Sequence, residues 1–505
     1  MKHFFILRIT CWGLLLLLVA ACSGGNSLKN TSSAVDPIAR LHHDIDALLS
    51  DSIFAQSNAG IKIMSLDRDE ILYSHNSNKL FHPASNMKLL TTATALKRLG
   101  PDFRYLTLFY ADSAAIRDST LNGNLYVKGF GNPDFTSDDL NWMAAELKSQ
   151  GIIAISGDII CDDSYFDDLF WGSGWMWDDA SAWYWAPISA LTINDNCVEL
   201  TVKPGAAVGD PLIATLTPQT SFMQINNNAA TVAESDSALR KEFKAQRRWK
   251  QPENVIDISG GRYLSDSPRT YTIDVIDAAL FFGTLLKERL IIDSITVAGN
   301  VVRGRTPENG ELLVQHLSPS MTDVVINTNK ISDNLSAENL LKTIGAEMRG
   351  LPGTAENGIS EIYKLLDEAG VDSTSYELAD GSGVSRYNVV TADLLIALLK
   401  AMHEDFRIQA EFKTSLPIAG VDGTLSRRMH GTAAYRNLRA KTGSLRGVSS
   451  LSGYTTTAED ETLAFAMIME HFVVPTSQIR KLQDKIGDLI SSFRREVETA
   501  KQSGN

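Results

Sequence analysis

The stretch Phe81-His82-Pro83-Ala84-Ser85-Asn86-Met87-Lys88-Leu89-Leu90 predicts a turn that leads into a helix. Pro83 fits the entry to a helix, because the N–H group that it lacks would have no partner there. Ser85 and Lys88 are three residues apart, so a helix places their side chains on one face. Apolar residues then recur at helical spacing until a Gly-Pro pair stops the run: Met87, Leu90, Ala93, Leu96 and Leu99.

Ser85 and Lys88 together make a chemically sensible acyl-transfer site. A serine hydroxyl needs a base within hydrogen-bonding reach before it acts as a nucleophile near neutral pH. A lysine one helical turn away can be that base if burial lowers its pKa. Backbone N–H groups at the helix N-terminus suit an anionic tetrahedral intermediate. The tetrapeptide alone is unspecific, because a helix-capping serine followed by a solvated lysine has the same pattern.

Length and composition describe an ordinary globular protein of more than one domain. The chain has 505 residues, of which 44% are hydrophobic and 21% are charged. Its formal net charge is −13, and it contains no long basic run. We therefore expect no nucleic acid partner.

Residues 1–21 are typical of an export signal peptide. Lys2 and Arg8 give a positive start, and Cys11 to Ala21 is almost wholly apolar. The run Val19-Ala20-Ala21-Cys22 resembles the lipobox of bacterial lipoproteins, in which the cysteine becomes the lipidated first residue. We expect a lipid on Cys22, a flexible lipid-anchored linker over residues 22–36, and an exported, periplasmic, membrane-anchored protein. A plain secretory signal cleaved near Ala21 is the alternative.

Two cysteines remain in the mature chain. Cys161 and Cys197 would lie in a compartment that permits disulfides, and a disulfide and two buried thiols fit the sequence equally well. No group of histidine and cysteine residues has the spacing of metal ligands, so no metal site is expected.

The order of predicted elements indicates an α+β fold with an insertion. A helix over 37–49, strands over 60–66 and 71–74, and the Ser85 helix come first. The chain then turns β-rich, with strands at 104–111, 124–128, 152–161, 197–202 and 294–303 and helices at 137–149 and 272–290. Helices follow at 321–330, 337–348, 355–369 and 391–403, then strands at 439–442, 447–455 and 463–470 and a helix at 477–497. We predict one catalytic domain from residues 37–102 plus 317–500, interrupted by inserted β-rich domains over 103–316.

The inserted part carries a cluster of tryptophans. A cluster of this kind suits a sugar-binding platform, and it also suits packing between subdomains, which is its commoner use. The sequence leaves its role open. The tryptophans are Trp171, Trp175, Trp177, Trp183 and Trp185.

Two further motifs join the Ser85 helix. Ser332-Asp333-Asn334 lies at a break between helices and offers a hydroxyl and an amide. Lys441-Thr442-Gly443-Ser444 lies on a predicted strand, where a cation, two hydroxyls and a glycine would suit a substrate carboxylate. The trio Ser-x-x-Lys, Ser-x-Asn and Lys-Thr-Gly, in this order, is the signature of penicillin-recognising serine enzymes.

Beyond the trio, the chain resembles the D-alanyl-D-alanine carboxypeptidase/endopeptidase family of the penicillin-binding protein 4 type, which belongs to the low-molecular-mass class C penicillin-binding proteins. The matching stretches span about residues 40–475. The distinctive ones are Asp380-Gly381-Ser382-Gly383-Val384-Ser385-Arg386 and Gly420-Val421-Asp422-Gly423-Thr424-Leu425. Ser444 stands where the family more often has threonine, and Asn132 where it often has aspartate.

The resemblance implies a split transpeptidase/β-lactamase-like domain, in which helices flank an antiparallel sheet, and a β-rich insertion that carries a nested subdomain. It also implies a reaction: acyl transfer from a peptide that ends in D-alanine, without cofactor or metal. In that reaction Ser85 is the nucleophile, Lys88 its base and Ser332 a proton relay. Five residues would bind the substrate, namely Asn334, Lys441, Thr442, Gly443 and Ser444, and Asp162 would face the diamino-acid side chain.

The expected partners are peptidoglycan peptides and β-lactam antibiotics, which would acylate Ser85. Two other functions stay open at this point. A β-lactamase-like hydrolase is one, although the chain lacks the Glu-x-x-Leu-Asn segment that supplies the deacylating base in the commonest class. A non-catalytic wall-binding lipoprotein that uses the tryptophans is the other, although a binding module needs no activated nucleophile.

Overall fold

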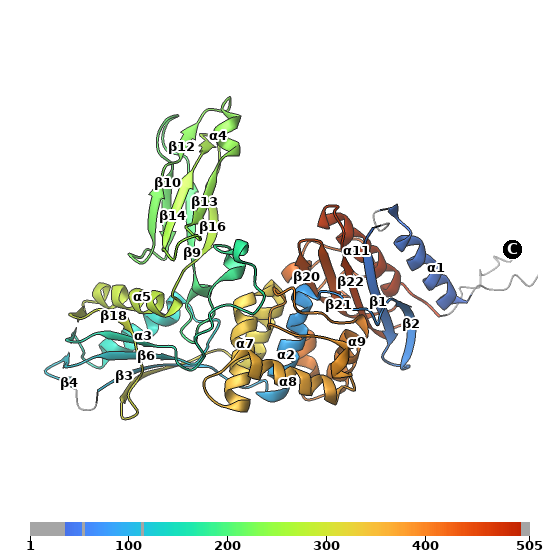
Figure 1. Ribbon diagram of the computed structural model, residues 1–505, viewed down its shortest axis with the longest axis horizontal. Coiled ribbons are helices and arrows are strands. Elements are labelled where there is room, and N and C mark those ends of the chain that lie inside the picture. Colours follow the sequence, from blue (N-terminus) through green and yellow to red (C-terminus); the bar gives the residue numbers. More distant parts are fainter. Residues whose placement is uncertain (1–35, 53–55, 113–115, 496–505) are drawn as a thin grey trace, which may run out of the picture. The chain divides into compact units, whose positions relative to one another are not determined.

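A computed structural model describes residues 36–52, 56–112 and 116–495. Its central sheet is antiparallel and five-stranded, in the order β2-β1-β22-β21-β20 (Figure 1). The sheet joins both ends of the described chain, because β1 pairs with β22 along its whole length. The strands are β1 (Asn58–Ser65), β2 (Glu70–His75), β20 (Arg439–Leu445), β21 (Val448–Thr456) and β22 (Thr462–Glu470).

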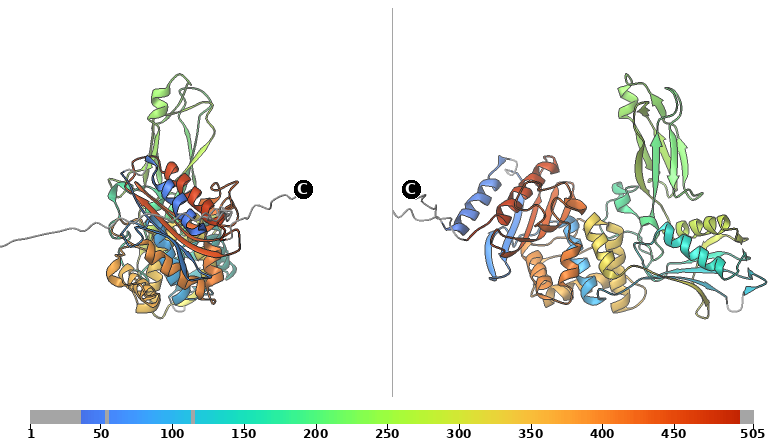
Figure 2. Two further views of the ribbon diagram at one scale, coloured as in Figure 1. Left: turned by 90° about the vertical axis from the view of Figure 1, so that its right-hand side faces the viewer. Right: turned by 180° about the vertical axis from the view of Figure 1, so that it is seen from behind.

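Helices cover both faces of this sheet. α1 (Pro37–Leu49) and α11 (Thr476–Ser491) lie side by side on one face (Figures 1 and 2) and bury Ile45 and Ile486 in a shared core. A second core fills the other face, under α2 (Met87–Arg98), α6 (Met321–Asn327), α7 (Asn334–Arg349), α8 (Ala355–Glu368), α9 (Ala392–Glu404) and α10 (Gln409–Ser415). The predicted α+β class, with helices flanking an antiparallel sheet, is confirmed.

The segment between α2 and α6 has a hydrophobic core of its own. Its main sheet has five strands in the order β18-β8-β6-β3-β19, covered by α3 (Ser137–Ser149) and α5 (Ala278–Ile292). These strands are β3 (Leu106–Ala111), β6 (Leu125–Gly129), β8 (Ile159–Asp162), β18 (Val301–Arg303) and β19 (Glu311–Leu317). A four-stranded sheet beside it contains β4 (Ile116–Arg117), β5 (Thr120–Leu121), β7 (Ala154–Ile155) and β17 (Thr296–Val297).

Between β8 and α5 the chain forms three small sheets (Figure 2). A buried ion pair links two of them, because Arg247 Nη2 lies 2.8 Å from Asp274 Oδ2. The strands are β9 (Cys197–Lys203), β10 (Ile213–Thr217), β11 (Gln224–Asn227), β12 (Ala230–Val232), β13 (Lys244–Arg247), β14 (Val255–Ser259), β15 (Gly261–Tyr263) and β16 (Arg269–Asp274), with the short helix α4 (Ser237–Lys241).

Several predicted boundaries were wrong. The helix expected over 272–290 begins only at Ala278, because residues up to Asp274 pair in β16 and Asp277 caps the helix. The strand expected over 152–161 is two short strands in different sheets. The helix expected over 321–330 changes into a π-helical turn at Thr328–Ser332, which shapes the site described below.

Cys161 and Cys197 are both buried and free, so the thiol alternative is confirmed. The signal peptide, Cys22 and the linker up to residue 35 lie outside the described residues. Within the described residues, no helix is long and apolar enough to cross a membrane. The same residues contain no group of three or more histidine, cysteine, aspartate or glutamate side chains arranged to hold a metal ion.

Candidate active site

Ser85 lies in the 3-10 turn Ala84–Asn86, directly before α2. The backbone at Ala84 has a φ of +48°, a left-handed conformation that costs a non-glycine residue about 1 kcal/mol or more. The Asn86 side chain holds this turn against the sheet, since its Nδ2 donates to the Lys441 carbonyl at 2.9 Å. Tertiary contacts therefore fix a strained position for the serine.

The Lys88 amine is hydrogen-bonded to three other residues of the site. Its Nζ donates to Ser85 Oγ at 3.3 Å, to Asn334 Oδ1 at 2.6 Å and to the Ser382 carbonyl at 2.8 Å. The three acceptors come from three separate segments of the chain. A lysine amine held this close to a serine hydroxyl can accept its proton.

Burial lowers the pKa of Lys88, which favours its action as a base. Its side chain has no exposed surface. Burial disfavours the charged ammonium and lowers the pKa of Lys88 to about 8, against the opposing pull of nearby carboxylates on Asp333, Asp380 and Glu338. A substantial fraction of Lys88 is then neutral near physiological pH, as a general base requires.

Ser332 and Lys441 form a second hydroxyl–amine pair. Ser332 ends the π-helical turn with a φ of +65°, and Lys441 comes from β20. Lys441 Nζ donates to Ser332 Oγ at 2.8 Å. Burial first, and the charge of Lys88 second, hold the pKa of Lys441 well below its usual range. This pair can pass a proton between the two sides of the site.

Asn334 is the first residue of α7, which Asp333 caps by accepting a bond from the Ser336 N–H at 2.6 Å. Asn334 Oδ1 accepts from Lys88, and Nδ2 donates to the Tyr184 carbonyl at 2.8 Å. A side-chain amide has two N–H donors, so a second donor is available to a ligand.

Gly443 lets β20 approach the Ser85 turn. A Cβ atom at this position would lie 2.1 Å from Ser450 Oγ, 2.8 Å from the Pro83 carbonyl and 2.9 Å from the Ser85 nitrogen. No side chain fits at such distances. Glycine therefore brings the backbone of Ser444 near that of Ser85, where their N–H groups can face one oxygen atom.

A pocket of about 800 Å³ opens over these residues. Its lining includes six of the residues predicted from sequence: Ser85, Ser332, Asn334, Thr442, Gly443 and Ser444. Lys88 and Lys441 have no exposed surface and lie beneath the lining. The structure thus brings all eight residues of the three motifs together, with both lysines inside the protein.

Asp162 is not part of this lining. Its carboxylate is almost completely buried and accepts bonds from Ser164 Oγ at 2.6 Å and from the Thr306 N–H at 2.8 Å. A contact between Asp162 and a substrate stays a prediction that the pocket geometry does not support. The acidic residues that do line the pocket are Asp178 and Asp179.

Sequence reasoning missed other residues that shape the pocket. Four arginines line it, namely Arg386, Arg428, Arg446 and Arg480. Arg428 is paired with Asp484 at 2.6 Å, whereas Arg480 Nη2 donates to Ser444 Oγ at 2.9 Å and forms no ion pair among the described residues. Arg386 ends one of the distinctive matching stretches, but no signal in the sequence links the other three to the site, because they meet it only in the folded protein.

The segment Asp380–Gly383 explains one of the distinctive sequence matches. Gly383 has a φ of +86°, and a Cβ there would lie 1.9 Å from the Ala84 carbonyl. The buried Glu338 carboxylate accepts bonds from the Gly381 and Ser382 N–H groups, which orients the Ser382 carbonyl toward Lys88. The segment therefore acts by holding the catalytic amine.

A nucleophilic serine, a lysine base on the same helix turn and a second serine–lysine pair, on an antiparallel sheet flanked by helices, define a serine-type acyl-transfer enzyme of the penicillin-recognising class. Comparison with known proteins identifies the family within that class. The D-Ala-D-Ala carboxypeptidase 3 (S13) family matches residues 41–491.

Similar proteins carry consistent names. The D-alanyl-D-alanine carboxypeptidase of Actinomadura sp. (strain R39) is 35% identical over 446 residues, which cover 85% of this chain and 81% of that protein. The D-alanyl-D-alanine carboxypeptidase DacB of Haemophilus influenzae is 29% identical, with 82% of this chain and 86% of that protein covered. The crystal structure of penicillin-binding protein 4 (dacB) from H. influenzae superposes with a TM-score of 0.79 at 25% identity, covering 89% of this chain and 99% of that one.

The chain belongs to the D-Ala-D-Ala carboxypeptidase 3 (S13) family and is a serine-type peptidase. The resemblance drawn from its motifs is confirmed.

Proposed function

We propose that this protein hydrolyses cell-wall peptides that end in, or are cross-linked through, D-alanine, by way of an acyl-enzyme on Ser85. One observation carries the proposal: a buried Lys88 amine with a lowered pKa lies 3.3 Å from Ser85 Oγ, at the floor of an open pocket. The names of the similar proteins support the D-alanyl-D-alanine substrate.

The acylation step follows from the contacts. Neutral Lys88 takes the proton of Ser85 Oγ as this oxygen attacks the carbonyl carbon of the scissile amide. Backbone N–H groups of Ser85 and Ser444 stabilise the oxyanion, and losing one such donor typically costs about 2.7–4 kcal/mol in barrier. Ser332, bonded to Lys441, relays a proton to the leaving amine. Water then hydrolyses the Ser85 ester and restores the hydroxyl.

Substrate binding uses the rest of the lining. Asn334 donates to a backbone carbonyl of the acyl part. The hydroxyls of Thr442 and Ser444 bind the carboxylate next to the scissile bond. The Lys441 amine is buried and bonded to Ser332, and its contact with the carboxylate stays a prediction. We assign the exposed positive charge beside the carboxylate to Arg480, which already bonds Ser444 Oγ.

Replacing Arg480 by glutamine is expected to raise KM for a peptide with a free terminal carboxylate about tenfold or more, because a charge-assisted hydrogen bond is lost. A peptide that ends in a carboxamide should bind both proteins alike. Arg446→Gln is the matched control. Arg446 lines the same pocket, but it is Arg480 that donates to Ser444 Oγ. Equal losses on both peptides would contradict a carboxylate-binding role for Arg480.

The acidic side of the pocket suits a cationic side chain of the peptide. Asp178 and Asp179 line it, and Tyr184 donates its hydroxyl to Asp179 Oδ1 at 2.9 Å. We propose that the amine of a diamino acid binds here. The buried Asp162 carboxylate, by contrast, already accepts three hydrogen bonds, two from Ser164 and one from Thr306.

β-Lactams should acylate Ser85, because they imitate the acyl-D-alanyl-D-alanine backbone. The H. influenzae protein has been solved with a bound β-lactam; it is 26% identical to this chain, with a TM-score of 0.71 and 88% of this chain and 97% of that one covered. Intact-mass spectrometry after brief exposure to penicillin tests the proposal. The expected result is one penicilloyl adduct on the peptide that contains Ser85.

The same measurement separates the rival functions. Rapid loss of the drug without an adduct would indicate a β-lactamase-like hydrolase. Neither adduct nor drug loss in a folded sample would indicate a non-catalytic wall-binding protein.

We further propose that the protein is exported to the periplasm and anchored by a lipid on Cys22. The charged start, the apolar run and the lipobox-like residues before Cys22 support this proposal. Detergent phase partitioning checks it: the full chain should enter the detergent phase, and the Cys22→Ala variant should stay in the aqueous phase. Equal partitioning of the two proteins would leave the plain secretory signal as the better interpretation.

A further inference from the structure

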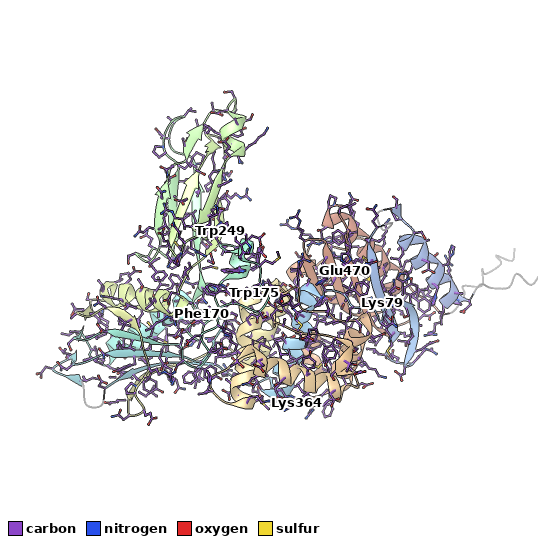
Figure 3. The ribbon with its side chains drawn as sticks, in the orientation of Figure 1. Lys79, Phe170, Trp175, Trp249, Lys364 and Glu470 are labelled. Carbon is purple, nitrogen blue, oxygen red and sulfur yellow. The ribbon has the colours of Figure 1, made fainter. Side chains whose placement is uncertain are left out.

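The tryptophans between residues 171 and 185 fall into two sets with different surroundings. Trp185 stacks on Trp171 with ring centroids 4.8 Å apart, and Trp175 Nε1 donates to Asp380 Oδ2 at 3.0 Å. Trp175 therefore joins the insertion to the segment that holds Lys88 (Figure 3 labels Trp175). The packing role considered from sequence accounts for Trp175, whereas Trp171 and Trp185 pack on each other within the insertion.

The outer set faces solvent instead. Trp177 is 69% exposed and Trp183 is 46% exposed. Trp249, from the turn between β13 and β14, joins them, with its ring centroid 5.2 Å from that of Trp177 (Figure 3 labels Trp249). Trp249 is half-buried, whereas Trp177 and Trp183 are exposed. Exposed tryptophans that gather beside a cavity mark binding surfaces, because leaving them in water gains the fold nothing.

Trp183 and Trp249 border a second cavity, of about 420 Å³, and Trp177 packs on Trp249 beside it. Trp183, Tyr184, Trp249 and Tyr271 contribute its aromatic lining. The residues Asp178, Asp179, Trp183 and Tyr184 line this cavity and the catalytic pocket alike, so the two lie next to each other along a shared wall. A ligand in the catalytic pocket can therefore extend over the aromatic cavity.

The chemistry of this cavity suits a saccharide. Aromatic faces pack against the C–H faces of sugar rings, and neutral polar groups bond hydroxyls; Ser181, Gln246 and Thr272 supply such groups here. Asp178 and Asp179 are the charged side chains of the lining. An uncharged sugar can occupy the aromatic part of the lining while these two aspartates, on the wall shared with the catalytic pocket, hold the amine of the peptide's diamino acid.

We propose that the cavity bordered by Trp183 and Trp249 binds the amino-sugar part of the cell-wall substrate, while the attached peptide occupies the catalytic pocket. This inference rests on the proposed function. Because the sugar is covalently joined to the peptide, its binding is effectively intramolecular and adds affinity without a new encounter. It leaves the reacting bond untouched, so it should lower KM and leave kcat unchanged.

Two substrates test the proposal: a peptide that ends in D-Ala-D-Ala, and the same peptide carrying its disaccharide. The wild type should have a KM for the disaccharide-peptide about five- to tenfold lower, with equal kcat. The double variant Trp177→Ala/Trp249→Ala removes a ring that lines the aromatic cavity, Trp249, together with the ring that packs on it. It should lose that preference and keep the wild-type constants on the bare peptide. Trp142→Ala is the matched control, because Trp142 is 47% exposed on α3, lines neither cavity and packs its ring on His316.

A second readout does not depend on turnover. Titration with the free disaccharide should change the tryptophan fluorescence of the wild type and of Trp142→Ala, and leave that of the double variant unchanged. If the wild type cleaves neither substrate, the proposed function fails, and this titration alone decides the saccharide site. A wild type that treats both substrates alike, or a double variant that loses affinity for both equally, would overturn the proposal.

Discussion

Replacing Ser85 by alanine should abolish peptide hydrolysis, with kcat lower by on the order of 10⁵-fold or more, because the acyl-enzyme can no longer form. The variant should stay folded, since Lys88 Nζ keeps Asn334 Oδ1 and the Ser382 carbonyl as acceptors. Release of D-alanine from a D-Ala-D-Ala peptide, together with the melting temperature, measures both effects. The penicilloyl adduct should vanish as well.

A matched serine is available as a control for Ser85. Ser336 lies buried in α7, two residues beyond Asn334, and its Oγ has no hydrogen-bond partner among the residues that the structure describes. Ser336→Ala should therefore keep activity within about twofold of the wild type, since no bond is lost. Residual turnover by Ser85→Ala above a hundredth of the wild-type rate would contradict the assignment of the nucleophile.

The second large effect concerns Lys88. Replacing it by methionine removes the base, and the rate of penicillin acylation should fall about 10²- to 10⁴-fold. In the wild type this rate should rise with pH and level off above about pH 8, because the neutral amine is the active form and the pKa of Lys88 is lowered to about 8. Stopped-flow acylation between pH 6 and 10 follows this change.

Lys88→Arg is the matched control, because arginine keeps its charge at every pH tested. Its acylation rate should stay low throughout, without the rise near pH 8. An unchanged inflection in Lys88→Met would contradict the prediction and transfer the titration to another group, of which the buried Lys441 is the first candidate.

The lowered pKa of Lys88 also bears on stability. The unfolded chain binds a proton at this lysine up to its ordinary pKa of 10.5, whereas the folded protein releases it near 8. Its contribution to the free energy of unfolding therefore rises with pH between these two values and levels off above 10.5. Lys88→Met should lack that rise.

Much of the catalytic site could be predicted from sequence because its motifs are local. Ser85 and Lys88 share a helix turn, and Thr442, Gly443 and Ser444 share a strand, so spacing alone relates their side chains. The strands of the central sheet were also found, since β21 and β22 are long runs with strong strand character. The short strands between residues 203 and 269 were missed, because a strand of three to five residues carries little periodic signal.

The family resemblance implied a contact between Asp162 and the substrate, and this contact stays a prediction. The folded chain buries the Asp162 carboxylate against Ser164 and Thr306. Asp179, in the 3-10 turn that contains Trp177, lines the pocket. Neighbourhood in sequence does not determine which side of a loop faces a cavity.

The sequence by itself predicted the chemistry of this protein: which serine would attack, which lysine lies near it, and which two motifs complete the set. These predictions follow from residue type and short spacing. Only the tertiary structure decided the pKa values of the two lysines and which other side chains lie beside the motif residues. Burial by α2, α7 and β20 lowers the pKa values of both lysines, and the meeting of α11 with β20 places Arg480 beside Ser444. Desolvation and long-range contacts exist only once distant segments pack together, and no local pattern encodes them.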